Sequence, residues 1–277
     1  MNTAAVLVGG KGTRLQSLVS DVPKPLANVA GEPFLFIILR ALRCAGITHV
    51  VLLTGYMQDK IVKACGDGQQ FDLQITYSQE HQALGTAGAL KNAQQNLLGC
   101  EEFLLLNGDT YLDCSLDGIV NYPLGKTIYG VLGVCEPDDA KRYGSIVLAK
   151  NSNQIISFRE KDSSANIQPL VSAGIYKLSE KILQCIPENK NCSLETEIFP
   201  FLLEHQHPLH AVKLAGDFCD IGVPDSYAGF SLKRMLSSKT FDPIARAFFS
   251  LFLMDEPLWT NHLIHSNVLV NFLKEEL

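Results

Sequence analysis

Short apolar runs alternate with helix-like segments through the first 110 residues. Residues 4–8 form a continuous apolar run that two glycines stop, and residues 49–55 and 103–109 contain similar runs. Such runs are typical of strands that are buried on both faces of a parallel sheet. Between them, apolar residues recur at helical spacing across residues 34–42, and residues 86–98 are also helix-like. The pattern predicts βαβ units in a doubly wound sheet with helices on both faces.

Strand-like segments crowd together from about residue 127 onward. One helical stretch, residues 194–205, interrupts them, and Pro200 within it predicts a kink or a break. The fold class that we expect is α/β, a Rossmann-like doubly wound mixed sheet with a smaller β-rich part that covers its strand ends. The character of the chain then changes, so we expect a catalytic domain over residues 1–236 and a helical C-terminal extension over residues 237–277.

Composition and charge exclude several classes of partner. The chain has 277 residues, a formal net charge of −6 and no block rich in Lys and Arg, which argues against nucleic acid. No stretch approaches the roughly 20 apolar residues that span a bilayer, and the first apolar run is too short for a signal peptide. The eight cysteines include no CxxC pair, so we expect free thiols in a reducing compartment. We therefore expect a cytoplasmic protein without a nucleic acid or membrane partner, and a homo-oligomer stays open.

A glycine-rich loop, "LVGGKGTRL", follows the first predicted strand. Closely spaced glycines let backbone N–H groups approach an anion. The loop lacks the GK[ST] of a Walker A motif, and Leu15 stands where a dinucleotide-binding loop needs Gly or Ala. Lys11 and Arg14 supply cations, and Lys24 in "PKP" adds another on a backbone that its two prolines restrict. Three cations around one glycine loop favour a triphosphate.

Two aspartates are candidate metal ligands. Asp109 lies at the carboxyl end of a predicted strand, where ligands gather in open α/β sheets, and Asp220 follows another strand-like stretch. Either one alone is equally typical of a turn or a helix cap. Together with a triphosphate loop they favour a shared Mg²⁺, which prefers oxygen ligands and substrate phosphates. We assign Asp113 and Asp117 to the surface.

The combination of "LVGGKGTRL" and "PKPL" resembles the signature of sugar-1-phosphate nucleotidylyltransferases, and the resemblance covers about residues 3–232. Within that family it is closest to D-glycero-D-manno-heptose 1-phosphate guanylyltransferases and next to mannose-1-phosphate guanylyltransferases. It implies that a sugar 1-phosphate oxygen attacks the α-phosphorus of a nucleoside triphosphate, giving a nucleotide-sugar and pyrophosphate. A phosphate monoester is mostly ionised at neutral pH, so the reaction needs no general base. The seven histidines accordingly fall in no metal or triad pattern.

The resemblance also implies the site residues. The expected catalytic residues are Arg14, Lys24 and Asp109, and the expected Mg²⁺ ligands are Asp109 and Asp220. The expected nucleotide-binding residues are Leu7, Gly9, Gly10, Lys11, Gly12, Thr13, Glu80, Gly85 and Thr86. The expected sugar-phosphate-binding residues lie beside Asp109, in "FREK" and elsewhere in the β-rich part. They are Asn107, Gly108, Tyr143, Gly144, Glu160, Lys161 and Gly174.

Glu80 is the residue that bears on the choice of base. A carboxylate can accept both the N1–H and the N2–H of guanine, so Glu80 favours GTP, although the neighbouring Gln79 offers an alternative. Ser172 bears on the identity of the sugar, because it stands where relatives often have Asn. A hydrogen bond to the sugar is then lost or water-mediated. Mannose 1-phosphate and glucose 1-phosphate therefore remain alternatives to the heptose.

Two alternatives come from other functional classes. A glycosyltransferase would need a DxD-like metal motif, which Asp109-Thr110-Tyr111 does not provide. A non-catalytic nucleotide-sugar sensor would keep the pocket and lose the chemistry. Arg14, Lys24 and both aspartates are all present, which favours the enzyme over the sensor.

Overall fold

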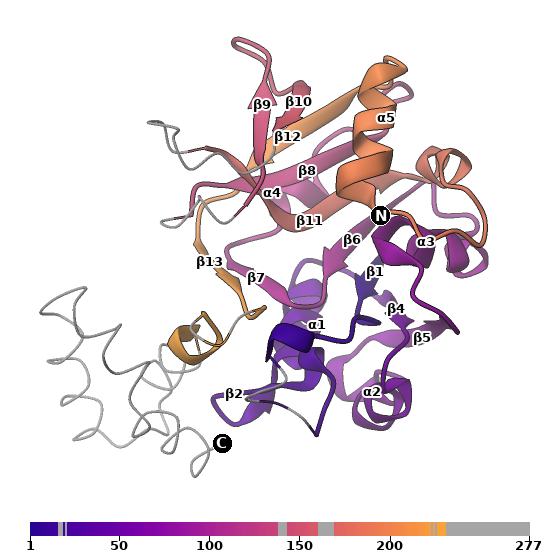
Figure 1. Ribbon diagram of the computed structural model, residues 1–277, viewed down its shortest axis with the longest axis vertical. Coiled ribbons are helices and arrows are strands. Elements are labelled where there is room, and N and C mark those ends of the chain that lie inside the picture. The colour runs from indigo at the N-terminus through magenta and orange to yellow at the C-terminus, as the bar shows by residue number, and fades with distance from the viewer. Residues whose placement is uncertain are drawn as a thin grey trace, which may run out of the picture.

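A seven-stranded mixed sheet runs through the middle of the molecule (Figure 1). The computed structural model describes residues 1–15, 19, 21–137, 143–159, 169–222, 224 and 226–230. The strands, in spatial order, are β12 (Leu209–Lys213), β8 (Gly130–Cys135), β11 (Val171–Ser179), β6 (Glu102–Asn107), β1 (Thr3–Leu7), β4 (His49–Thr54) and β5 (Gln74–Gln79). In the described part of the chain, β11 alone runs antiparallel to its neighbours in this sheet.

The order of the strands reverses at β1. The chain leaves β1 for β4 and β5 on one side, and then returns to place β6 on the other side of β1. Both β4 and β6 are parallel to β1, with Ala5 opposite Val51 and Leu105. In open α/β sheets, ligands bind at the carboxyl ends of the strands where this reversal occurs. The fold therefore directs attention to the segments that follow β1 and β6.

Alternate residues of β1 pack into two separate cores. Ala4 and Val6 face a cluster that includes α1 (Phe34–Cys44) and α2 (Gln58–Cys65). Ala5 faces the opposite cluster, which includes α3 (Gly85–Asn92) and α5 (Phe199–Glu204). Because strand side chains alternate between faces, a run that is apolar at every position requires cover on both sides. The prediction of a doubly wound sheet with helices on both faces is confirmed.

Three strands of the second half extend the central sheet. The expectation that they would cover its strand ends as an added sheet is wrong for β8, β11 and β12, which join the central sheet beside β6. All six residues of β8 are buried, so this strand needs neighbours on both edges and cover on both faces. The other strands of the second half form pairs outside the sheet: β9 (Ser145–Leu148) with β10 (Ile155–Arg159), and β13 (Asp217–Asp220) with β7 (Thr110–Asp113).

The predicted kink or break at Pro200 takes the form of a change in helix type, and the helix continues through it. A π-helical turn over Leu194–Ile198 gives way to α5 at Phe199, and Pro200 lies in the first turn, where its missing N–H needs no partner. The remaining short elements are α4 (Asp117–Val120), the strand pair β2 (Asn28–Val29) and β3 (Glu32–Pro33), and the 3₁₀ turns Thr13–Leu15, Lys24–Leu26, Gln69–Phe71, Gln94–Leu97 and Glu180–Cys185.

The described residues bear on the cysteines and on membrane-spanning helices, but not on the predicted C-terminal extension. All eight cysteines are free, as predicted. Among the described residues, no helix combines the length and the apolar character needed to cross a membrane. The predicted helical extension over residues 237–277 lies outside the described residues, as do Glu160 and Lys161.

Candidate active site

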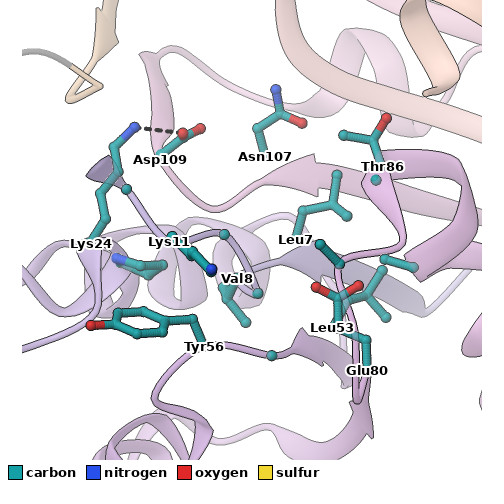
Figure 2. A pocket seen from close by; sticks show the side chains of 18 of the residues that line it. Leu7, Val8, Lys11, Lys24, Leu53, Tyr56, Glu80, Thr86, Asn107 and Asp109 are labelled. Atoms are coloured by element: carbon teal, nitrogen blue, oxygen red, sulfur yellow. Dashed lines mark hydrogen bonds and ion pairs between the residues drawn. The ribbon is translucent and has the colours of Figure 1, made fainter. Parts of the chain in front are cut away.

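A pocket of about 870 Å³ opens where β1, β4, β5 and β6 end. Figure 2 shows Lys24 pointing to Asp109 at one end of the pocket, with Glu80 beside Leu53 at the other. Most of the predicted site residues line it, namely Leu7, Gly9, Gly10, Lys11, Gly12, Thr13, Arg14, Lys24, Glu80, Gly85, Thr86, Asn107 and Asp109. The predicted catalytic residues and the predicted nucleotide residues therefore face one common space.

The glycine loop and the "PKPL" segment meet through Gly12 and Lys24. Gly12 has φ +58°, and a Cβ placed on it would lie 2.8 Å from the Cβ of Lys24. Any larger residue there would be strained and would also collide with the lysine stem. The glycine thus lets the aliphatic part of Lys24 cross the loop, while the side chain stays nearly buried, with 8% of its surface exposed.

Lys24 carries its charge between the two predicted metal ligands. Its Nζ lies 2.6 Å from Asp109 Oδ2 and 3.8 Å from Asp220 Oδ1. Strand pairing brings these distant aspartates together, because Asp220 in β13 pairs with Thr110 in β7, directly after Asp109. The backbone N–H of Ile221 also donates to the Asp109 carbonyl at 3.0 Å. Two carboxylates therefore converge on one cationic position.

This convergence fits a divalent cation. Hard carboxylate oxygens are the donors that Mg²⁺ prefers, and it commonly takes only one or two of them together with water and substrate phosphates. Within the described residues, no group of three or more His, Cys, Asp and Glu side chains is arranged to hold a metal. Asp109 and Asp220 would thus be the protein's share of a site that phosphate oxygens complete.

Close backbone contacts hold Asp109 at the end of β6. The preceding residue, Gly108, donates its N–H to the Leu7 carbonyl at 2.9 Å, and a Cβ on Gly108 would lie 2.5 Å from that oxygen. Gly222 has a similar place beside the second aspartate, because its N–H donates to Asp220 Oδ1 at 2.6 Å. Both glycines are required by close approach. Gly108, predicted as a sugar-phosphate residue, packs behind the pocket and does not line it.

Glu80 packs against the glycine loop at the other end of the pocket. A Cβ on Gly9 or on Gly55 would lie 2.9 or 2.8 Å from Glu80 Oε1, so both glycines make room for this carboxylate. The second oxygen, Oε2, accepts the Leu84 N–H at 3.2 Å. Burial raises the pKa of Glu80, and the hydrogen bond from Leu84 opposes that rise. An ionised carboxylate has about four acceptor sites, so it retains capacity for a ligand's N–H groups.

The start of α3 is built onto a distant loop. The N–H groups of Ala87 and Gly88 both donate to the Cys192 carbonyl, at 2.9 and 3.3 Å. A Cβ on Gly85 would lie 2.5 Å from the same carbonyl oxygen. Two of the four N–H groups that a helix leaves unpaired at its start are thus satisfied by the protein itself. Thr86 remains on the pocket wall.

The predicted sugar-phosphate residues are only partly brought together. Asn107 lines the pocket, and Gly174, with φ +68°, packs against it so closely that a Cβ would lie 2.9 Å from Asn107 Nδ2. Tyr143 and Gly144 are not among the lining residues, and the Tyr143 ring packs edge-on against Phe218 of β13. Gly144 abuts the Arg159 carbonyl instead.

Several lining residues escaped the sequence analysis. Gly55 and Tyr56 follow β4, and the Tyr56 N–H donates to the Gly9 carbonyl at 3.1 Å. Asn191 and Gly222 come from loops much later in the chain. The signal for Gly55 was a glycine directly after a buried strand, which also reads as an ordinary turn. Asn191 carries no local signal at all.

A nucleotidyl transferase family model matches residues 3–235 of this chain. The chain belongs to the nucleotidyl transferase family. The relatives include a mannose-1-phosphate guanyltransferase beta-A of Xenopus laevis, 34% identical, and a mannose-1-phosphate guanylyltransferase of Mycobacterium tuberculosis, 31% identical. Each match covers 81% of this chain and 62% of the relative, so the chain spans less than two thirds of their length.

Solved structures of this family share the fold. HddC from Yersinia pseudotuberculosis, crystallised with GMP-PN, is 29% identical to this chain, with a TM-score of 0.72. The match covers 84% of this chain and 100% of that protein. The resemblance to nucleotidylyltransferases that the glycine loop and "PKPL" carried is thereby confirmed at the level of the family.

Proposed function

We propose that this protein transfers a nucleotidyl group from a nucleoside triphosphate to a sugar 1-phosphate. The observation that carries the proposal is the approach of Lys24 to both Asp109 and Asp220 beside the glycine loop. This arrangement suits the binding of phosphates and a divalent cation, and membership of the nucleotidyl transferase family supports it.

Guanine is the base that we propose. Glu80 lies at the end of the pocket away from Lys24, and its carboxylate can accept the adjacent N1–H and N2–H of guanine (Figure 2). Adenine and the pyrimidines lack this pair of donors on one edge. The guanylyltransferase names of the relatives and the GMP-PN complex of HddC support the same choice.

For the sugar we propose a manno configuration. The similarity in sequence to mannose-1-phosphate guanylyltransferases favours mannose 1-phosphate, whereas the resemblance carried by the glycine loop and "PKPL" favours the heptose. Mannose and D-glycero-D-manno-heptose share the same ring stereochemistry and differ only in the group beyond the ring. Ring recognition by residues such as Asn107 would accept both, so the extension beyond C5 decides between them.

The chemistry follows from the charges on the substrates. A sugar 1-phosphate is mostly dianionic at neutral pH and acts as a nucleophile without a general base. Its oxygen attacks the α-phosphorus, a new P–O bond forms, and pyrophosphate leaves with the electron pair of the broken bond. Two anions must be brought together in line, so the work of Lys24, Arg14 and Lys11 is to orient phosphates and offset their charge. Mg²⁺ held by Asp109 and Asp220 would supply further charge neutralisation.

A substrate matrix tests the proposal. Each nucleoside triphosphate is combined with mannose 1-phosphate, D-glycero-D-manno-heptose 1-phosphate or glucose 1-phosphate in the presence of Mg²⁺, and pyrophosphate release is measured. We expect turnover with GTP and a manno sugar, and weak turnover with glucose 1-phosphate, whose ring differs at C2. Binding of GTP without turnover of any pair would contradict the enzyme and support a nucleotide-sugar sensor.

A further inference from the structure

Three hydroxyl groups converge on the carboxylate of Glu195. Thr86 Oγ1 and Ser193 Oγ donate to its Oε2 at 2.8 and 3.1 Å, and the Tyr176 hydroxyl donates to its Oε1 at 3.1 Å. Thr86 lies in α3 and Tyr176 in β11, whereas Ser193 directly precedes the π-helical turn that carries Glu195. Neither the glycine loop nor the metal aspartates contact Glu195, so its role must be exerted through these hydroxyls.

One arm of this network reaches the nucleotide side of the pocket. The Thr86 hydroxyl accepts the Leu194 N–H at 2.8 Å and donates a hydrogen bond to Glu195. Ser193 likewise accepts the Thr196 N–H at 3.2 Å and donates to Glu195. Each hydroxyl is thus used once as an acceptor and once as a donor, and both donate toward the carboxylate because it has only acceptors to offer.

The other arm reaches the sugar side of the pocket. Tyr176 accepts a hydrogen bond from Ser172 Oγ at 3.1 Å, and Ser172 Oγ in turn accepts the Gly174 N–H at 3.2 Å. Gly174 packs against Asn107, which lines the pocket. The hydroxyl of Ser172, the residue that departs from the family pattern, is therefore used inside the protein and orients this loop.

The Tyr176 hydroxyl keeps its proton and donates it in a hydrogen bond to Glu195. The residue is only 1% exposed, and burial, followed by the charge of Glu195, holds the pKa of Tyr176 well above its ordinary value. At the end of the arm, Asn107 Oδ1 is buried and has no hydrogen-bond partner among the described residues. Gly174 packs closely against this amide, so a shift of the Gly174 loop would also shift Asn107.

We propose that Glu195 is a positioning residue that sets the Thr86 wall and the Asn107 wall of the pocket at a fixed spacing. The assignment of these walls to nucleotide and sugar phosphate rests on the proposed function. A partly buried carboxylate that only accepts is needed because three donors share two oxygens, and an amide would present its own N–H₂ to hydroxyls that already donate. Misalignment of both substrates reduces in-line attack, since a displacement of about 1 Å costs on the order of 100-fold in rate.

Glu195→Gln is the first test, with the substrate pair that the wild-type protein turns over fastest in the matrix. We expect the KM of the nucleotide and the KM of the sugar 1-phosphate each to rise at least about tenfold, because hydrogen bonds to a charged group are lost on both arms. The matched control is Glu197→Gln, two residues away, whose carboxylate accepts the backbone N–H of Ser193, at 2.9 Å, and none of the three hydroxyls that donate to Glu195. Both KM values of this control should stay within about twofold, whatever its Tm.

Two further variants separate the arms. Tyr176→Phe keeps the buried ring and removes only the hydroxyl of the sugar-side arm, so it should raise the KM of the sugar 1-phosphate and leave that of the nucleotide within about twofold. Thr86→Val should show the opposite pattern. These variants also decide the matter if Glu195→Gln does not fold.

Hydrogen exchange gives a readout that does not depend on any activity. In Glu195→Gln, amides of residues 84–88 and of residues 171–176 should both exchange faster than in wild type, whereas Glu197→Gln should leave them unchanged. Unchanged exchange in either segment, or single-arm variants that raise both KM values equally, would overturn the inference. A wild-type protein that turns over no pair would count against the proposed function instead, and the exchange result would still stand.

Discussion

Lys24 has a nearly buried ammonium group within reach of two carboxylates. Its removal should have two opposite effects. In Lys24→Gln we expect kcat/KM to fall by at least about 100-fold, since one preorganised group for the phosphate charge is lost. The affinity of the nucleotide-free protein for Mn²⁺ should rise, because Asp109 and Asp220 lose the cation that offsets their charge.

Electron paramagnetic resonance titration of Mn²⁺ measures the second effect without any turnover. The matched control is Lys213→Gln, which removes a lysine whose side chain is 59% exposed and whose partner is Glu136. Lys213→Gln should change neither kcat/KM nor the affinity for Mn²⁺ by more than about twofold, because exposed ion pairs contribute little. Weaker Mn²⁺ binding in Lys24→Gln would contradict the opposition between the lysine and the metal.

Glu80 gives a second prediction at the same scale. Glu80→Gln keeps the size of the side chain but replaces one acceptor oxygen with a donor, which faces the N–H groups of guanine. We expect the preference for GTP over ATP to fall at least about tenfold, the size of one hydrogen bond to a charged group. Competition binding with both nucleotides measures the ratio, and an unchanged ratio would remove Glu80 from base recognition.

The pKa of Glu80 adds a pH dependence. Because burial raises this pKa, the carboxylate becomes protonated at a higher pH than an ordinary glutamate as the solution is acidified. Protonation removes the acceptor, so the affinity for GTP should fall as the pH decreases through that raised pKa. The same rise means that the folded state favours the protonated form, so ionisation of Glu80 reduces stability as the pH rises.

The Tm of Glu80→Gln should therefore exceed that of wild type at neutral pH, and the two should converge once the pH is below the pKa of an unfolded glutamate. Thermal melts across the acidic range, together with GTP titrations at the same pH values, test both statements. A Tm difference that widens on acidification would have the wrong sign.

At the scale of elements, the end of β4 touches the loop after β1. A Cβ on Gly55 would lie 2.8 Å from Glu80 Oε1 and 3.0 Å from the Gly9 carbonyl, so Gly55→Ala should displace the Glu80 side chain. We expect the KM for GTP to rise about tenfold and stability to fall by about 1–3 kcal/mol, as in other overpacked sites.

The control for this change is Gly118→Ala in α4. A Cβ there would have ordinary contacts with Leu214 and Val212, at 3.7 and 3.9 Å, and alanine favours a helix. Its KM for GTP should match wild type. Equal effects of the two substitutions would show that the Gly55 contact has no special bearing on the pocket.

The elements also show which features of the fold and the site could be predicted from sequence patterns. β1, its glycine loop and the placement of Lys24 could be predicted because each rests on residues that are neighbours in the chain. The place of Asp220 after a strand-like stretch made it a candidate, but its approach to Asp109 could not be predicted, since it depends on the pairing of β13 with β7. An apolar run such as β8 predicts a buried strand but does not say which sheet it joins, and that is why the second half was assigned to a separate layer.

Glu195 shows more clearly which contacts sequence patterns cannot predict. Two of its three donors, Thr86 and Tyr176, come from segments that no local pattern connects to it, and its own segment, "LETEI", predicted only a helix. Tyr143 and Gly144 stay predictions from a motif match, and neither lines the pocket. Contacts between distant segments depend on the packed fold, which spacing along the chain does not encode.

At the scale of the whole molecule, two cores flank one sheet, and stability should follow burial within them. Leu52 of β4 is fully buried, so Leu52→Ala should lower the free energy of unfolding by about 2–5 kcal/mol through lost burial and a residual cavity. Leu98 is 56% exposed, and Leu98→Ala should cost no more than about 0.5 kcal/mol. Chemical denaturation of both variants measures the contrast, and similar values would contradict the two-core description.

The pairing of β13 with β7 also has a consequence for synthesis of the chain. The last strand of the central sheet ends at Lys213, so all seven strands of that sheet precede Asp220 in the chain. Until β13 emerges from the ribosome and docks, Asp109 has Lys24 beside it but lacks the second carboxylate. A translation product that stops between Lys213 and Asp220 would hold every strand of the central sheet and only one of the two carboxylates that approach Lys24.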